Sequence, residues 1–505
     1  MKHCCSVLSL SVFVLALLNL PARAQQPVPV HPVNPNYSAI KKHIDASVPK
    51  SVKTPGPAVV GSSPVTGVSW QGLAAGNYSP SDANGAIGPN SYIEMVNTEI
   101  GVYDRSGNLL SSNSEAGLTG FAAAAGDGEV IYSPQDSRFY ASMLSFPKSG
   151  TPSLLIFGFS KGPSPSAAAS DWCFYRSGFG GRYGNNLPDY PKLGQSADFI
   201  LIGVNTFQFA QTYLASDVAW VSKPPAGNIT TCPALSSLML GVKTKLLNAD
   251  GSLASTPVPA NQVDGSSVDW IVANKDPGAG TSTVLSVFRV SKSATTGKPI
   301  FGAAKTVTVT AYAYPPSAPQ AGTNDTLDTL DSRLTNAISA TDPRVGAPVV
   351  WTQHTVAAST GGLGSEVRWY EIKPSTGTLF QNGIAQSSSA YVFMGAISPD
   401  RNGTSHQFGK NMVLGFNTSS SSTFPAAAMI SKVGNNPASG FVAVASSTAA
   451  DTDFSCTPPL PCRWGDYSGA SPDPASATGN VWLSVMLNGS TGNPSWITWN
   501  WEATP

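Results

Sequence analysis

Four aspartates stand at comparable positions, each just before the first short strand of a repeated unit. They are Asp82, Asp127, Asp189 and Asp466, and Asp269 is a possible fifth member. If the repeats surround an axis, these carboxylates form a ring that could accept hydrogen bonds from a hydroxyl-rich ligand or hold a cation. The alternative role is structural, because Asp at a turn also accepts hydrogen bonds from backbone N–H groups and ties neighbouring repeats together.

Aromatic and basic residues accompany two of these aspartates. Tyr190 follows Asp189 and Tyr467 follows Asp466, while Lys192 and Arg463 lie close by in sequence. Tyrosine rings stack on sugars, so we treat these residues with the aspartates as ligand-binding candidates.

His354 is a separate candidate, in the segment Trp351-Thr-Gln-His-Thr355. On a strand that faces a channel it could act as an acid or a base. The alternative is a histidine that is hydrogen-bonded inside the core.

Sharp catalytic motifs are missing. The sequence contains no H-E-x-x-H and no G-x-S-x-G, and we assign no catalytic residue. Ser398 to Thr404 comes near the Asp-box of sialidase propellers, but its glycine is displaced by one position and no tryptophan follows. A glycosidase needs a pair of carboxylates, and the glutamates that could supply it are Glu94, Glu99, Glu129, Glu366 and Glu371.

The charge balance excludes some partners. Charged residues make up 11% of the chain and the formal net charge is zero, so no global field favours nucleic acid or anionic lipid. We predict no cofactor and no metal; calcium at an acidic loop is possible, but we find no run of ligands for it.

The start of the chain predicts export. Residues 1–24 have a positive start, an apolar run and Ala22-Arg23-Ala24, which is typical of a secretory signal peptide rather than a membrane anchor. No later segment is apolar for long enough to span a bilayer. We therefore expect a secreted, periplasmic or cell-surface protein.

Four cysteines remain after the signal peptide: Cys173, Cys232, Cys456 and Cys462. In an exported chain they predict disulfides, and three pairings are possible. Proximity favours Cys456 with Cys462, which leaves Cys173 with Cys232. A zinc site is the alternative, but no paired C-x-x-C or nearby histidine supports it.

The elements that must position these residues are β-strands. Asp82 to Leu110 predicts a small antiparallel sheet, with strands near Ala86 to Gly88, Tyr92 to Val96 and Ile100 to Tyr103, and a fourth strand starting at Leu109. Its Asp104–Asn108 hairpin contains a glycine where positive φ is needed.

This unit recurs about seven times along the chain, with loops of varying length between the copies. We predict an all-β fold, a single β-propeller of about seven four-stranded blades over residues 71–505. Residues 25–70, rich in Pro and Ser, form an arm or linker. Within them Ser38 to Ser47 could form one or two helical turns, and Pro57 to Trp70 could instead be a strand that pairs into the fold. The alternative architecture is two or more β-sandwiches.

Several phrases together resemble those of large, mostly uncharacterised secreted bacterial proteins with predicted β-propeller folds. They include DANGAIGPNSY, PDYPKLG, LDTLDSRL and RWGDYS. The resemblance implies the fold and export, and it implies no reaction.

Two functions follow as expectations. The first is a non-catalytic binding protein that holds a glycan, or a cell-surface or extracellular protein, on the loop face of the propeller. The second is a sialidase-like glycoside hydrolase with a carboxylate pair at the channel mouth. The sequence does not indicate an oligomeric state.

Overall fold

The computed structural model describes residues 32–48, 60–122, 126–145, 153–209, 211–401 and 409–505. The predicted signal peptide at residues 1–24 lies outside these ranges. Within them, no helix is both long and apolar enough to cross a membrane.

The sheet predicted from Asp82 onward is confirmed. It contains β2 (Asn84–Ile87), β3 (Ser91–Val96), β4 (Glu99–Asp104) and β5 (Leu109–Ser114), hydrogen-bonded in that order. All pairs are antiparallel, and Gly107 has a φ of 83° in the β4–β5 hairpin. The turn residues and the short apolar runs therefore suffice to define this unit.

Three further sheets have a similar meandering order. The second contains β6 (Glu129–Ser133), β7 (Arg138–Ser145), β8 (Leu154–Ser160) and β9 (Trp172–Ser177). The third contains β24 (Tyr391–Pro399), β25 (Met412–Ser420), β26 (Thr423–Lys432) and β27 (Val442–Ser446). The fourth contains β14 (Ser255–Pro259), β16 (Val268–Asn274), β17 (Ser282–Lys292), β18 (Pro299–Phe301) and β19 (Lys305–Tyr312).

One larger sheet has nine strands. In order these are β13 (Leu240–Lys243), β12 (Thr212–Ser222), β11 (Phe199–Gln208), β10 (Asn186–Gln195), β15 (Asn261–Gln262), β20 (Leu334–Asp342), β21 (Ala347–Ala357), β22 (Ser365–Lys373) and β23 (Thr378–Ala385). Strand β15 joins two antiparallel halves, because Asn261 pairs in parallel with both Gln195 and Ile338. The hydrogen-bonded sheets therefore do not divide cleanly into about seven blades.

The last sheet joins the two ends of the fold. It contains β1 (Val65–Ala74), β30 (Trp496–Thr504), β29 (Val481–Asn488) and β28 (Gly469–Pro472). Val65 pairs with Thr504 and Ala74 with Ile497, so β1 and β30 are antiparallel neighbours. Strand β1 spans the predicted boundary between residues 70 and 71.

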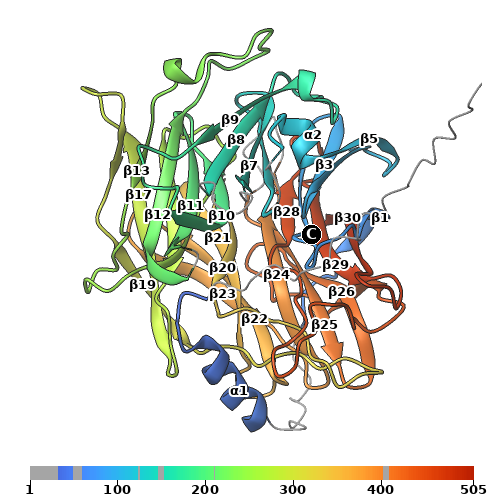
Figure 1. Ribbon diagram of the computed structural model, residues 1–505. Helices are drawn as coiled ribbons and strands as arrows, with labels where there is room; N and C mark the ends of the chain where they lie inside the picture. The colour runs from blue at the N-terminus through green and yellow to red at the C-terminus, as the bar shows by residue number, and fades with distance from the viewer. Residues whose placement is uncertain (1–31, 49–59, 123–125, 146–152, 210, 402–408) are drawn as a thin grey trace, which may run out of the picture.

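The innermost strands form a closed ring. Contacts run in chain order from β2 to β6, β10, β14, β20, β24 and β28, and β28 returns to β2. The sheets thus stand around one axis, as Figure 1 shows. This is a β-propeller, and the alternative of separate sandwiches is wrong.

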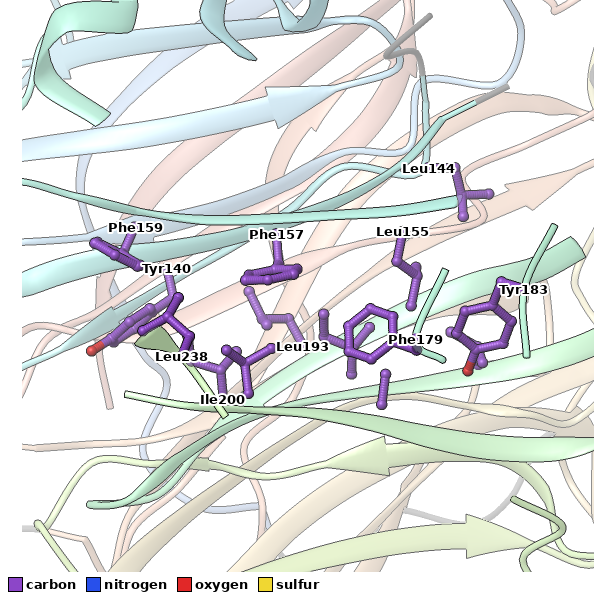
Figure 2. Packing of buried hydrophobic residues seen from close by; sticks show 14 of the residues in the cluster. Tyr140, Leu144, Leu155, Phe157, Phe159, Phe179, Tyr183, Leu193, Ile200 and Leu238 are labelled. Atoms are coloured by element: carbon purple, nitrogen blue, oxygen red, sulfur yellow. The ribbon is translucent and has the colours of Figure 1, made fainter. Parts of the chain in front are cut away.

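The core lies between neighbouring sheets. Figure 2 shows one such layer, where Phe157 and Leu155 of β8 face Ile200 of β11 and Leu193 of β10. Strands such as β7 are buried along their whole length, because each middle strand packs on a neighbouring sheet at both faces. That explains why these strands carry continuous apolar runs rather than strict alternation.

The helices lie outside the sheets, whereas one disulfide begins in a strand, because Cys173 belongs to β9. Helix α1 (Tyr37–Ser47) has 11 residues, longer than the one or two turns expected, and lies at the lower edge of Figure 1. Helix α2 (Glu115–Thr119) and the 3-10 turns η1 (Ala169–Asp171) and η2 (Leu235–Ser237) are short. The disulfides are Cys173–Cys232 and Cys456–Cys462, the pairing that proximity favoured, and they are consistent with an exported protein.

Candidate functional site

A left-handed residue lies within or just before every innermost strand. The seven residues, with φ between 45° and 62°, are Asp82, Asp127, Tyr190, Thr256, Ser332, Met394 and Asp466. A non-glycine residue in this region costs of the order of 1 kcal/mol or more, so seven equivalent ones indicate a repeated constraint. We call this set the left-handed ring.

Three acids occupy consecutive places on the left-handed ring. Asp466, Asp82 and Asp127 precede β28, β2 and β6, strands that are neighbours around the axis. The Asp82 backbone N–H donates to the carbonyl of Gly465 at 3.1 Å, which links the first two positions directly. We call these three residues the acidic arc.

The acidic arc is buried and its acids are difficult to ionise. Burial raises the pKa of Asp82 well above its usual value, and the charges of Asp127 and Asp466 add to this. Burial, with Asp189 and Asp466, raises the pKa of Asp127 to about 7. Burial raises the pKa of Asp466 to about 6, although Arg463 opposes the shift. Perturbed carboxyls of this kind gather at functional sites more often than elsewhere.

Two carboxylate oxygens of the acidic arc are unsatisfied. Oδ1 of Asp82 and Oδ1 of Asp466 are buried and have no hydrogen-bond partner among the described residues. The third acid, Asp127, has a hydrogen-bond donor, because the Tyr467 hydroxyl donates to its Oδ2 at 3.1 Å. Buried oxygens without a partner are uncommon, so the arc can accept further donors.

Two tyrosines, Tyr190 and Tyr467, pack against each other beside the acidic arc. Tyr190 comes from β10 and Tyr467 precedes β28, strands that β2 and β6 separate around the ring. Their ring centroids are only 4.7 Å apart, and the Tyr190 hydroxyl donates to the Asp466 carbonyl at 2.6 Å. The pair therefore reaches across the axis.

Two cations, Lys192 and Arg333, lie over the rings of the tyrosine pair. Lys192 Nζ lies 3.6 Å from the ring centroid of Tyr467 and donates to Oε1 of Glu129 at 2.9 Å. Arg333 lies 4.5 Å from the ring centroid of Tyr190 and pairs with Asp331. Such cation–π contacts hold the rings in place.

Arg463 connects the acidic arc to a covering loop. Its guanidinium forms ion pairs with Asp466 and with Asp328, whose Oδ2 is 3.5 Å from Nη1. Asp328 belongs to the segment 313–333 between β19 and β20. This segment covers the mouth and supplies Asp331 and Arg333 as well.

Helix α1 clamps the covering loop. The Tyr37 hydroxyl donates to Oδ1 of Asp328 at 3.2 Å. The buried Lys41 ammonium donates to the Pro315 carbonyl and to Oγ1 of Thr329, both at 2.7 Å. The arm is thus fastened to the loop by polar contacts within the fold.

A narrow cavity lies on the axis among the inner strands. Its volume is about 30 Å³, and Asn84, Glu129, Leu193, Asn261, Asn336 and Ser468 are among its lining residues. A single water needs roughly 10–15 Å³ on this measure. The cavity holds two or three waters and is too small for a sugar ring.

The structure places the predicted site residues unevenly. Asp82, Asp127, Tyr190, Lys192, Arg463, Asp466 and Tyr467 gather at one mouth, as the contacts above show. Asp189 lies one residue before the left-handed position of its strand and acts electrostatically on Asp127. Asp269 is not a member of the ring, because it lies in β16, and Thr256 holds the left-handed position of that unit.

His354 lies in β21, behind the ring rather than in the channel. It is fully buried. Its Nδ1 is 2.9 Å from the Ser332 carbonyl and its Nε2 is 3.0 Å from the Tyr370 hydroxyl. Burial lowers its pKa to about 3, so the imidazole is neutral at ordinary pH. Its contact with the Ser332 carbonyl holds that residue in position.

The buried glutamates have partners inside the fold. Glu94 accepts from the Leu73 backbone and from Asn500 and so fastens β1 and β30. Glu129 pairs with Lys192, Glu366 with Arg368, and Glu371 with Arg344. Glu371 also shares a hydrogen bond with the carboxyl of Asp342, and both acids bind Arg344, so this carboxylate pair is already bound by a cation inside the fold.

Sequence reasoning missed Asp328, Asp331 and Arg333. They lie in the phrase TLDTLDSRL, which contributed to the resemblance but suggested no role. The signal was the density of charge in a chain with few charged residues, where a D-x-x-D-x-R run is unusual.

Comparisons with known proteins add little about activity. No protein-family model and no curated protein matches the chain. Among solved structures, the propeller of Dos1 is 10% identical, covering 87% of this chain and 95% of that one, with a TM-score of 0.38. A protein of unknown function from Dyadobacter fermentans is 11% identical over 76% and 95% of the two chains, with a TM-score of 0.35. An endo-arabinase from Bacteroides thetaiotaomicron is 9% identical over 62% and 93%, with a TM-score of 0.28. Fold similarity at this level carries no implication for function.

Proposed function

We propose that this protein is an exported β-propeller that binds a ligand without chemical conversion, and that the acidic arc is the centre of its binding site. The observation that carries the proposal is the pair of buried, unpartnered oxygens on Asp82 and Asp466. A ligand that donates hydrogen bonds to them removes a cost of roughly 1–3 kcal/mol for each unsatisfied group.

The ligand class follows from charge and size. The arc offers acceptors next to aromatic rings, which suits a hydroxyl group of a glycan or the ammonium or guanidinium group of a protein. The axial cavity of about 30 Å³ is lined by inner-strand residues that do not include the three acids, so we expect the ligand to reach the acidic arc from the loop side.

We also propose that the repeat number is seven. The left-handed ring has one member at each of seven inner strands. On this view the nine-stranded sheet is two blades that β15 joins.

The test is a glycan array probed with the mature protein, together with a screen for extracellular protein partners. For any ligand found, Asp82→Asn is expected to weaken binding by about tenfold, since a buried hydrogen-bonding group left without its partner costs about 1–3 kcal/mol. The matched control is Asp198→Asn, an acid paired with Lys292 at the surface, which should leave affinity unchanged. Equal affinity of wild type and Asp82→Asn for every ligand would refute the acidic arc as the site.

A hydrolase is the second candidate. The observation in its favour is the pKa of Asp127, raised to about 7, which is suitable for a general acid. The closed tyrosine pair and the small cavity favour binding alone. Product analysis on each glycan hit separates the two, because turnover lost in Asp127→Asn would replace the binding proposal with the enzymatic one.

A further inference from the structure

A second acidic cluster lies apart from the left-handed ring, beside the Cys456–Cys462 disulfide. Oxygens of Asp451 and Asp453 lie within 4.8 Å of each other and of the Cys456 sulfur. An oxygen of Asp325 lies within the same distance of both cysteine sulfurs. Asp325 also acts electrostatically on Asp451. Two buried carboxylates, Asp451 and Asp453, therefore converge on one small volume, and Asp325 lies beside the same disulfide.

Two oxygens in this cluster have no partner among the residues described. Oδ2 of Asp451 and Oδ2 of Asp453 are buried and unbonded, and the two residues are only 2% and 4% exposed. Their other oxygens are occupied: Oδ1 of Asp451 accepts from the Asp453 backbone, and Oδ1 of Asp453 accepts from the Ser455 backbone. The free oxygens belong to side chains whose orientation is already fixed.

The surrounding contacts hold this geometry rigidly. Gln320 forms two hydrogen bonds with the backbone of Asp451. Its Oε1 accepts from the N–H and its Nε2 donates to the carbonyl, both at 2.7 Å. The disulfide closes the chain directly after Ser455. Such a preformed loop is unfavourable for two adjacent acids unless something positive compensates them.

We infer that Asp451 and Asp453 form a binding site for a hard divalent cation of the calcium class, with Asp325 adding negative charge from beside the disulfide. The donor set is oxygen only, because both cysteines are in a disulfide and offer no thiolate, which argues against zinc. The order Asp451-Thr-Asp453-Phe-Ser455 places oxygen-bearing side chains at alternate positions, as calcium loops do. Asp325 is partly exposed and so gives the ion a route from solvent, with water filling the remaining positions.

The alternative is a proton shared between Asp451 and Asp453. Without a cation, burial and the neighbouring Asp453 raise the pKa of Asp451 to about 8. A shared proton would make the fold indifferent to calcium. The two explanations therefore differ in a direct measurement.

The test compares thermal unfolding of the mature protein in EDTA and in excess CaCl2, with calcium stoichiometry by isothermal titration calorimetry. Calcium is expected to raise the midpoint of unfolding by about 3 °C when well above its Kd. Asp451→Asn should abolish both the shift and the heat of binding. Asp250→Asn, which alters an exposed acid elsewhere, should retain them.

Loss of folding is not expected to obscure this result. In EDTA, Asp451→Asn removes one of two adjacent buried carboxylates, so the variant should be at least as stable as wild type. Asp453→Asn gives a second test of the same ligand set. No calcium heat in wild type, or an undiminished shift in both variants, would overturn the proposal.

Discussion

The two disulfides are similarly buried and differ mainly in the length of chain that each one closes. One joins cysteines 59 positions apart, the other cysteines 6 positions apart. Each pair contains one fully buried cysteine, Cys173 or Cys462, and one that is partly exposed. Replacing either pair with alanine should therefore cost a similar amount in packing, and the remaining difference reflects the length of the loop released in the unfolded chain.

The chain-entropy relation gives the magnitude. A loop of roughly 60 residues corresponds to about 4.3 kcal/mol and one of roughly 7 residues to about 2.3 kcal/mol. The Cys173/Cys232 double alanine variant should thus be less stable than the Cys456/Cys462 variant by about 2 kcal/mol.

The assay is urea unfolding followed by tryptophan fluorescence, without reductant and in EDTA, so that the proposed cation site beside Cys456 does not contribute. Free energies of unfolding are compared at equal m-values. Equal destabilisation by the two variants, or a larger loss for the shorter loop, would refute the argument from loop length.

Three further predictions concern buried polar groups. Lys41→Met leaves the Thr329 hydroxyl and two carbonyls without their donor. We therefore expect the free energy of unfolding to fall by about 3–5 kcal/mol and backbone amides of α1 to exchange faster with solvent. Unchanged exchange would show that Lys41 does not hold the helix on the loop. Burial raises the pKa of Glu115 to about 8, whereas in the unfolded chain its pKa is near 4.5. Between these two pH values the folded state holds a proton that the unfolded state lacks, so the free energy of unfolding falls by roughly 1 kcal/mol for each unit that the pH rises. Urea unfolding of Glu115→Gln should show a flatter pH dependence, and an identical slope would count against it. Tyr467→Phe removes a donor to Asp127, so the pKa of Asp127 should rise further above about 7 in a carbon-13 NMR titration, and a fall would be contrary to this reasoning.

Local features of the fold were predictable from sequence. The sheet from Asn84 to Ser114 follows from short-range turn chemistry and apolar runs, and so does the repetition of that unit. The length of α1 was underestimated, because its stability depends on contacts made by Lys41 with residues almost 290 positions away. Strand β15 was also missed, since two residues carry no periodic signal.

The site was only partly predictable. The aspartates at 82, 127 and 466 stood out because aspartate tolerates the left-handed region. Tyr190, Thr256, Ser332 and Met394 occupy the same position with no shared residue type, so the full ring has no sequence signature. The crossing of Tyr190 to Tyr467 depends on closure of the ring, which only the tertiary structure provides.

The pairing of β1 with β30 determines when the ring can close during folding. Ser69 and Trp499 share a hydrogen bond although 430 positions separate them, and Glu94 secures both strands from a third. The ring therefore cannot close until both β1 and β30 have been synthesised. This pairing of distant segments makes closure of the ring a late event in folding, and a change in either strand affects the whole ring.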